Sequence, residues 1–384
     1  MKNVCILGGG ASALMCACCA KDNVNVKIIE QNSKVGKKIL ATGNGRCNLT
    51  NKIVNDKSYN TDIKNFLNKF NQFDTLNFFN SIGLETYADN EGRVYPFSNS
   101  ASSVLEVLLN YLINKKNINI DTDKKFVDIE KIDNKYRIQF EDSFEDFDEV
   151  IVALGNKANL NLFEKFGVKN NPFVPSLCGL KTSKNKNLAG TRVSNVKVFC
   201  KAVNFEETGE ILFREDGISG IVIFNLSAFL SRAKINSAEI IIDLMPNINF
   251  EILLNKLKNR KELLKNYKIN DFLTGFFNKT INFDLINKLK FDLEKDVSKL
   301  SDKDLFNLAK LIKNYSIKTL GFLDNNQVFN GGVKLSSLTN CLEAINQKGL
   351  YFIGEIVDVD GVCGGYNLQW AWTSGKIVGE NLWN

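Results

Sequence analysis

The chain has 384 residues, of which 44% are hydrophobic and 24% charged, with a formal net charge of +6. This length supplies enough core for two or three domains, and no apolar run approaches the ~20 residues that a membrane span needs. Because the chain has no histidine and no paired C-x-x-C units, the sequence predicts neither a zinc nor an iron–sulfur site. The modest positive charge permits an RNA partner without demonstrating one.

The nine cysteines are unevenly spaced and indicate reduced packing residues rather than disulfides. The sequence begins on its first expected core strand, so no signal peptide is expected ahead of the fold. Together these features predict a cytoplasmic protein without membrane or metal partners. The sequence does not define its oligomeric state.

The opening residues predict a dinucleotide-binding turn. A short apolar strand, Val4 to Leu7, is followed by Gly8, Gly10 and Ala13 in the G-x-G-x-x-(G/A) spacing and by an apolar helix through Ala20. The first glycine permits a tight turn, the second lets a pyrophosphate approach the backbone, and Ser12 lies in the same first helical turn.

A second strand, Val24 to Ile29, ends in Glu30. A carboxylate about 20 residues after the glycines is placed to hydrogen-bond an adenosine ribose, and it disfavours a 2′-phosphate. Gln31 follows it and is included in the predicted cofactor site. The ordered succession of strand, glycines, helix, strand and acid makes a purely structural turn the minority interpretation.

The loop from Gly36 to Asn51 is rich in glycines, amides and cations. We expect Lys38 and Arg46 to neutralise phosphate, and Cys47 and Asn48 to lie nearer the reactive ring of the cofactor. A basic surface loop is an equally good interpretation of these residues alone. The same loop supplies further predicted cofactor contacts at Thr42, Gly43, Asn44 and Gly45.

The middle of the chain changes character twice. A returning strand and turn, Val150 to Asn156, contribute Gly155 to the predicted cofactor site. Short β-rich runs then predict a small barrel or sandwich; they are VKVFCKAV, EILFRED, IVIFNLS and EIIIDL, between Ser194 and Leu244. From Phe250 to Lys313 the spacing of apolar residues predicts helices, with an N-cap signal at Ser301-x-x-Asp304. Thr319 to Leu335 is strand-like again and leads back to the first domain.

The C-terminal segment predicts a second glycine-bearing turn. A strand, Leu350 to Ile353, precedes Gly354 and Glu355, and a helix is expected to start near Asn367 and to run past Trp372. The N-terminus of such a helix carries about half a positive charge, which suits the negative charge of a reduced flavin near N1 and O2. A glycine-rich loop before a packed terminal helix is the plainer alternative. The remaining predicted cofactor residues here are Asp360, Gly364, Gly365, Tyr366 and Asn367.

Five stretches together resemble one bacterial family of FAD-dependent oxidoreductases, the BaiN/RdsA-type or aminoacetone-oxidase-like group. They are ATGNGRCNLTN, GRVYPFS, DGISG, NGGVKL and GEIVDVDGVCGGYNLQWAWTSG, and they occur in order over nearly the whole chain. The resemblance implies an α/β fold in which a Rossmann-like FAD domain is interrupted by an insert with a small β-barrel and a helical subdomain. The expected boundaries are residues 1–180 with 331–384 for the FAD domain, 181–248 with 314–330 for the barrel, and 249–313 for the helical insert.

The resemblance also implies an activity. We expect an FAD-dependent reductase of a conjugated or nucleobase C=C bond, with uridine in ribosomal RNA as one candidate substrate. A diffusing NAD(P)H is the expected electron source, because no second G-x-G-x-x-G domain is evident. Two alternatives stay open: an amine or aminoketone oxidase that uses O₂, and a flavin-binding protein without turnover.

The absence of histidine limits the chemistry further. Histidyl attachment of FAD is impossible, so we expect non-covalent binding unless a cysteine links the cofactor. A proton donor must come from another residue type, and Cys47, with Tyr95 behind it, is the best-placed candidate by motif. Arg46 is expected to lower the pKa of the neighbouring thiol. A role for Cys47 in packing against the flavin is an equal alternative.

The segment from Arg214 to Ile221 departs from the family pattern. Relatives commonly carry a Thr-His pair and a proline in L-F-T-H-x-G-L-S-G-P, whereas this chain has Arg214-Glu215-Asp216 and Ile221. The family histidine therefore cannot be carried over. This departure leaves the substrate, and the role of the altered segment, less defined than FAD binding.

Overall fold

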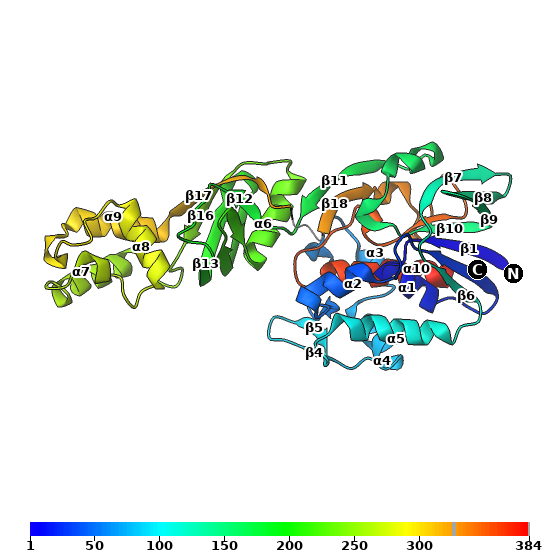
Figure 1. Ribbon diagram of the computed structural model, residues 1–384, viewed down its shortest axis with the longest axis horizontal. Coiled ribbons are helices and arrows are strands. Elements are labelled where there is room, and N and C mark those ends of the chain that lie inside the picture. Colours follow the sequence, from blue (N-terminus) through cyan, green and yellow to red (C-terminus); the bar gives the residue numbers. More distant parts are fainter. Residues whose placement is uncertain (325–327, 383–384) are drawn as a thin grey trace. The chain divides into compact units, whose positions relative to one another are not determined.

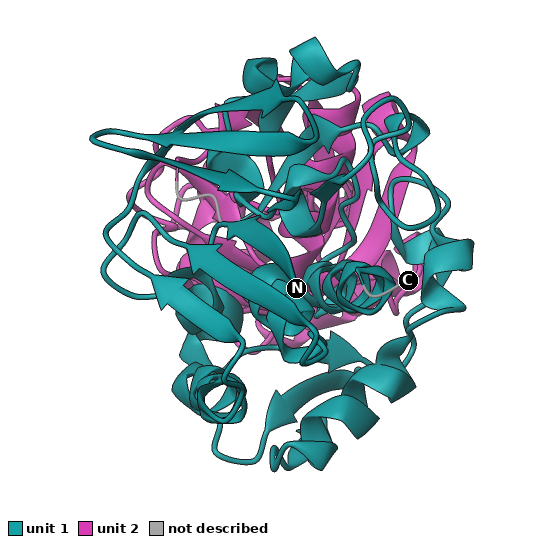
Figure 2. Ribbon diagram, turned by 90° about the vertical axis from the view of Figure 1, so that its right-hand side faces the viewer, with its two compact units in different colours: residues 1–174, 328–384 teal, residues 175–327 magenta. Residues whose placement is uncertain are grey.

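The computed structural model describes residues 1–324 and 328–382. The chain divides into two compact units (Figure 2): unit 1 is Met1–Val174 with Val328–Asn384, and unit 2 is Pro175–Gln327. The expected separation of a barrel domain from a helical domain stays a prediction, because residues 175–327 form one unit.

Unit 1 is built on a five-stranded parallel sheet in the order β19-β10-β1-β2-β6. Its central strands are apolar and buried, as parallel strands covered on both faces are. The strands are β1 (Lys2–Leu7), β2 (Val24–Ile29), β6 (Ile118–Asp121), β10 (Glu149–Val152) and β19 (Leu350–Phe352). The predicted strand Val24 to Ile29 is confirmed at both ends. The apolar strand predicted from Val4 begins two residues earlier.

Two helices from opposite ends of the chain pack side by side in unit 1 (Figure 1): α1 (Ala11–Cys18) and α10 (Tyr366–Asn381). Gly375 and Gly379 form the contact on α10. A Cβ atom at Gly375 would lie 2.4 Å from the Ser12 carbonyl oxygen, and one at Gly379 would lie 2.7 Å from the Cys16 carbonyl oxygen. Only glycine lets the two backbones approach this closely.

Smaller elements complete unit 1. A three-stranded sheet in the order β3-β5-β4 follows the loop after β2, and a β7-β8-β9 meander precedes β10. Their bounds are β3 (Thr50–Asn51), β4 (Thr86–Ala88), β5 (Arg93–Pro96), β7 (Phe126–Ile132), β8 (Lys135–Phe140) and β9 (Phe144–Phe147). The other helices are α2 (Lys37–Ala41), α3 (Lys64–Leu67), α4 (Gln72–Ser81) and α5 (Ala101–Ile113), and β11 (Asn170–Ser176) pairs with β18 (Val328–Val333).

Unit 2 contains a closed antiparallel barrel in the order β12-β15-β14-β13-β16-β17 and three helices inserted between β16 and β17. The predicted N-cap at Ser301 is confirmed as a capping box with Asp304. The strands are β12 (Leu180–Thr182), β13 (Arg192–Cys200), β14 (Phe205–Phe213), β15 (Gly217–Ser219), β16 (Glu239–Asp243) and β17 (Tyr315–Phe322). The helices are α7 (Phe250–Leu263), α8 (Lys279–Lys288) and α9 (Asp302–Lys313). Within the predicted strand-like stretch 319–335, residues 325–327 lie outside the described residues.

The prediction of a β-rich run at IVIFNLS is wrong. These residues begin helix α6 (Ile221–Arg232), which packs on β14. Val222, Ile223 and Leu226 are buried at helical spacing, but a short continuous apolar run does not distinguish a buried strand from a buried helix. Gly220, with φ of 115°, turns the chain out of β15 before the helix starts.

No helix among residues 1–324 and 328–382 is long and apolar enough to cross a bilayer. The same residues contain no group of three or more Cys, Asp or Glu side chains that could hold a metal ion.

The close crossing of α1 and α10 yields a stability prediction. Gly→Ala inside a helix normally stabilises, but Gly375→Ala would force a methyl group against the Ser12 carbonyl oxygen. We expect the free energy of unfolding to fall by about 1–3 kcal/mol in urea titrations. Glu380→Ala, at an exposed position of the same helix, is the control and should change it by no more than about 0.5 kcal/mol. Equal stability of Gly375→Ala and the parent would contradict the close packing.

Candidate functional site

The glycine turn after β1 has the geometry of a phosphate site. Gly8 has φ of 100°, and a Cβ atom there would lie 2.6 Å from the Ala153 carbonyl oxygen. A Cβ atom at Gly10 would meet nothing within 4 Å, so Gly10 borders open space. Helix α1 starts directly after Gly10, and no side chain caps it. Its first N–H groups are therefore available to an anionic ligand. Ser12 and Ala13 lie buried in its first turn.

The Glu30 carboxylate is fixed beside this turn. Its Oε2 accepts a hydrogen bond from the Gly9 N–H at 2.8 Å, and its Oε1 accepts one from the Asn32 N–H at 2.9 Å. The carboxylate at the end of β2 is thus tied to the glycine turn after β1. Gln31, next to it, is exposed. The ribose contacts of both residues stay predictions.

The N-terminal and C-terminal halves of the predicted site meet at Gly354. A Cβ atom built there would lie 2.4 Å from Ser12 Oγ, so the turn after β19 touches the first turn of α1. Beside it, the Glu355 carboxylate forms an ion pair with Lys38, and a Cβ atom at Gly155 would lie 3.4 Å from Glu355 Oε2. The structure therefore brings these five predicted residues together, from four separate stretches of sequence.

The GRCN loop, residues 42–48, folds back on itself. Gly43, Asn44 and Cys47 have left-handed φ values of 57°, 55° and 58°, and Gly45 has φ of 81°. The Cys47 N–H donates to the Thr42 carbonyl oxygen at 3.0 Å, and Thr42 Oγ1 donates to the Ile39 carbonyl oxygen at 2.6 Å. The loop is thus closed by its own backbone.

The GRCN loop meets the N-terminus of α10 at Asn48. A Cβ atom at Gly365, the N-cap of α10, would lie 2.5 Å from the Thr50 carbonyl oxygen and 2.9 Å from Asn48 Oδ1. Asn48 Oδ1 is buried and accepts no hydrogen bond from the described chain. A buried amide oxygen without a partner, next to an uncapped helix N-terminus, indicates that a ligand completes the site.

Three predicted cofactor residues make hydrogen bonds within the chain, and their contacts with the cofactor stay predictions. The Tyr366 carbonyl oxygen accepts from Tyr59 OH at 2.9 Å. The Asn367 side chain accepts from the Gly361 N–H at 3.0 Å and donates to the Gly361 carbonyl oxygen at 3.1 Å. Asp360 is buried, and its N–H donates to Asn60 Oδ1 at 3.1 Å. These bonds shape the turn before α10. Gly364 shares in it, since its carbonyl oxygen accepts from Asn51 Nδ2 at 3.1 Å.

The two candidate proton donors are buried. Burial raises the pKa of the Cys47 thiol to about 11, although a hydrogen bond with Thr42 opposes the rise. Burial likewise raises the pKa of the Tyr95 phenol, against the positive charges of Arg93 and Arg46. Both groups are protonated at neutral pH.

The expectation that Arg46 lowers the thiol pKa is wrong. Its guanidinium carbon lies 4.6 Å from the centre of the Tyr95 ring, over the ring face, and its Nε donates to the Gly43 carbonyl oxygen at 3.5 Å. Arg46 and Cys47 are adjacent in sequence, but their side chains have different surroundings. The left-handed backbone at Cys47 turns its thiol into the core, whereas the Arg46 guanidinium lies over the Tyr95 ring.

Sequence reasoning missed the residues that hold the loop against α10. Thr50 Oγ1 donates to Gln369 Oε1 at 2.6 Å, and Gln369 Nε2 donates to Thr75 Oγ1 at 2.9 Å. Trp372 Nε1 donates to the Leu49 carbonyl oxygen at 2.9 Å. The signal for them was a polar Gln and two Trp residues on an otherwise buried helix.

Taken together, these features fit FAD. The open space at Gly10 and the free N–H groups of α1 suit its pyrophosphate, and the unpartnered Asn48 oxygen and the α10 N-terminus suit its flavin end. A Rossmann unit with two uncapped helix N-termini, one from each end of the chain, is the arrangement expected of the class of FAD-binding oxidoreductases.

Comparison with known proteins identifies the family. The HI0933-like protein Rossmann domain model matches residues 2–381, and the chain belongs to this family of FAD-dependent oxidoreductases. The chain is 33% identical over 406 residues to the 3-dehydro-bile acid delta(4,6)-reductase of Clostridium scindens, covering 99% of this chain and 98% of that protein. It is 25% identical over 399 residues to the ribosomal RNA dihydrouridine synthase of Escherichia coli, covering 98% and 97%.

Among solved structures, the fold is similar to that of 3-ketosteroid delta1-dehydrogenase from Sterolibacterium denitrificans. The TM-score is 0.52 at 12% identity, over 100% of this chain and 99% of that chain. At this identity the similarity concerns the fold alone.

The open space at Gly10 gives a prediction about the cofactor. We expect the purified parent protein to be yellow and to release intact FAD on denaturation. Gly10→Leu should remain folded, because no protein atom lies within 4 Å of the new Cβ, yet lose FAD because the side chain occupies the pyrophosphate position. Visible absorbance and mass spectrometry of the released cofactor measure both. Recovery of FMN from the parent, or full FAD content in Gly10→Leu, would contradict the assignment.

Proposed function

We propose that the protein is an FAD-dependent reductase of a C=C bond conjugated to a carbonyl group, with NAD(P)H as its electron source. The observation that carries the proposal is the close approach of the GRCN loop, which contains Cys47, to the uncapped N-terminus of α10. The names of the two relatives support it, since both describe saturation of a ring C=C bond, in a bile acid and in uridine.

Bound FAD would supply the hydride that such a reduction adds to one carbon of the double bond. In the proposal, the N–H groups of α1 and Lys38 face the pyrophosphate, and Glu30 holds the ribose. Asn48 Oδ1 and the first N–H groups of α10 face the flavin. The positive end of α10 stabilises negative charge at that end of the site. The remaining predicted contacts, from residues 42–47 and 354–367, shape the walls between these points.

A proton must reach the neighbouring carbon of the substrate. Cys47 and Tyr95 both hold a proton at neutral pH, and the Arg46 guanidinium over the Tyr95 ring disfavours proton uptake nearby. We propose Cys47 as the donor, with Tyr95 as the second candidate. Complete burial of Cys47 is equally compatible with a packing role, which the variant below decides.

The substrate class is a cyclic C=C–C=O unit, which a steroid enone and uracil share. We keep uridine in ribosomal RNA as the proposed natural substrate. Saturation removes the C5=C6 bond of uracil, so the base must leave its stack to lie on the cofactor, and loosely structured RNA is the preferred form.

Anaerobic reduction separates this proposal from an oxidase. We expect NADH or NADPH to bleach the flavin absorbance rapidly, and simple amines or aminoketones to leave it unchanged. A stopped-flow spectrometer measures both. Bleaching by an amine with no response to NAD(P)H would replace the reductase by an amine oxidase. Failure of both reductants would favour a binding protein without turnover.

Cys47→Ser tests the proton donor. We expect normal FAD content and a loss of about 10²- to 10⁴-fold in the single-turnover rate of substrate reduction. Because the Cys47 pKa is raised to about 11, the parent's rate should stay level between about pH 6 and pH 9. Cys178→Ser is a matched control, since burial also raises the pKa of that thiol to about 11. An unchanged rate in Cys47→Ser would leave Cys47 as a packing residue.

A further inference from the structure

Positive charge is concentrated in the helices of unit 2. Residues 250–313 contain fourteen Lys and Arg against nine Asp and Glu, a net charge of +5. The entire chain has a net charge of +6. One sixth of the sequence therefore supplies nearly all of the excess charge, which the average composition conceals.

Most of these cations lack an acidic partner. Within residues 250–313, all of which the structure describes, only Lys258, Lys268, Lys295 and Lys313 form ion pairs. Eight of the others are exposed lysines: Lys256, Lys265, Lys279, Lys288, Lys290, Lys299, Lys303 and Lys310. Unpaired lysines that repel one another are stabilised by a polyanion, whose bound counterions they displace.

Large aromatic side chains are exposed among these lysines. Tyr267 is 56% exposed, Phe306 47% and Phe283 39%. Exposed rings beside cations provide stacking surfaces for nucleobases, which are accessible in single-stranded RNA.

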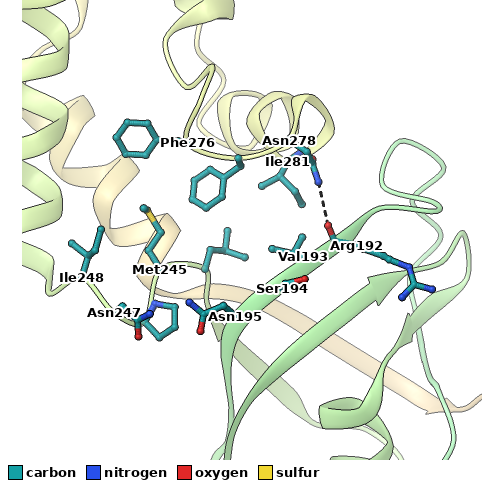
Figure 3. A pocket seen from close by; sticks show the side chains of 13 residues that line it. Arg192, Val193, Ser194, Asn195, Met245, Asn247, Ile248, Phe276, Asn278 and Ile281 are labelled. Carbon is teal, nitrogen blue, oxygen red and sulfur yellow. Dashed lines mark hydrogen bonds between the residues drawn. The ribbon is translucent and has the colours of Figure 1, made fainter. Parts of the chain in front are cut away.

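A pocket of about 430 Å³ lies in the same unit (Figure 3). Three segments line it: residues 192–195 of β13, residues 244–248 between β16 and α7, and residues 276–278 with Ile281 at the start of α8. Its surface combines the rings of Phe276 and Phe277 with amide side chains. The volume suits a nucleobase with its sugar.

The amides of the pocket differ in availability. Asn278 is engaged, because its Oδ1 accepts from the Ile281 N–H at 2.9 Å and its Nδ2 donates to the Arg192 carbonyl oxygen at 3.3 Å. Asn195 and Asn247 make no side-chain hydrogen bond within the described parts of the chain. Asn195 sits where the β13–β14 register shifts and has φ of 54°. Bulges of this kind redirect side chains at binding sites.

We propose that unit 2 binds single-stranded RNA, with one base in this pocket against Asn195, Asn247 and the phenylalanine pair, and with phosphates on the unpaired lysines. The free amides offer donors and acceptors to a base edge, and the rings offer stacking. Lys279 is exposed, forms no ion pair and directly follows the pocket residue Asn278 in sequence, whereas Arg192 in the pocket lining is paired with Glu210. This inference rests on the proposed function with uridine in ribosomal RNA as the substrate.

Fluorescence anisotropy with labelled single-stranded oligoribonucleotides of about 12 nucleotides tests this on the FAD-loaded protein. We expect binding that weakens steeply with salt, because each phosphate contact adds about −0.7 to the slope of log K against log salt. Lys279→Gln should lower that slope by about one contact. Lys268→Gln, whose ammonium is already paired with Asp296 at 2.8 Å, is its matched control and should leave the slope unchanged.

The pocket is tested by Asn195→Asp with Asn247→Asp, which keep the size of both side chains. We expect RNA affinity to fall about tenfold. Asn270→Asp, an exposed amide of the same unit outside the pocket, should change it by less than about twofold. Equal losses in the double variant and in the Asn270 control would overturn the pocket assignment, and salt-independent or absent RNA binding by the parent would overturn the whole inference.

A parallel assay keeps this inference separate from the proposed function. Reduction of a small cyclic enone by all the variants should match the parent, because none of the altered residues belongs to the predicted FAD site. An active enone reductase that does not bind RNA would remove the inference and leave the proposed function standing. RNA binding without reduction of an enone or of uridine would remove the proposed function and leave the RNA-binding inference standing.

Discussion

The close crossing of α1 and α10 is the constraint on which the rest of unit 1 depends. Gly375 and Gly379 bring the backbones of the first and last helices together, and Gly354 meets Ser12 at the same junction. Since each helix starts at a glycine without a side-chain cap, the crossing also fixes the relation of two anion-binding helix ends. One extended dinucleotide can then be held by segments that are more than 300 residues apart.

The second organising feature is a set of buried polar bonds that hold the GRCN loop to α10. Gln369 bridges Thr50 and Thr75, and Trp372 binds the Leu49 carbonyl oxygen. Buried polar groups of this kind are costly unless fully bonded, so they define one loop position rather than several. Asn48 Oδ1 lies next to these bonded groups but is itself buried without a hydrogen-bond partner in the described chain.

Features of the fold and of the candidate site could be predicted from the sequence where they are determined by residues close together in the chain. Strand Val24–Ile29 and the capping box at Ser301 follow from residue type and spacing within a few positions, and both are confirmed. Helix α6 was missed because its buried face is decided by contact with β14. The influence of Arg46 on Cys47 was mispredicted because it depends on a left-handed φ that sequence adjacency does not reveal. The cofactor contact of Asn367 stays a prediction, and within the chain its side chain is hydrogen-bonded to Gly361.

The net charge of the whole chain conceals how unevenly the charged residues are distributed along the sequence. A net charge of +6 on 384 residues is unremarkable for a whole chain, but its location in the helices of unit 2 leaves the FAD-binding unit almost neutral overall. In the proposed site, local features, namely the helix N-termini and Lys38, would meet the cofactor's phosphates, since unit 1 carries no general positive field. A field spread over the inserted helices serves a ligand with many charges. The proposed chemistry and the proposed RNA binding thus have different electrostatic requirements, which fall on different segments of the chain.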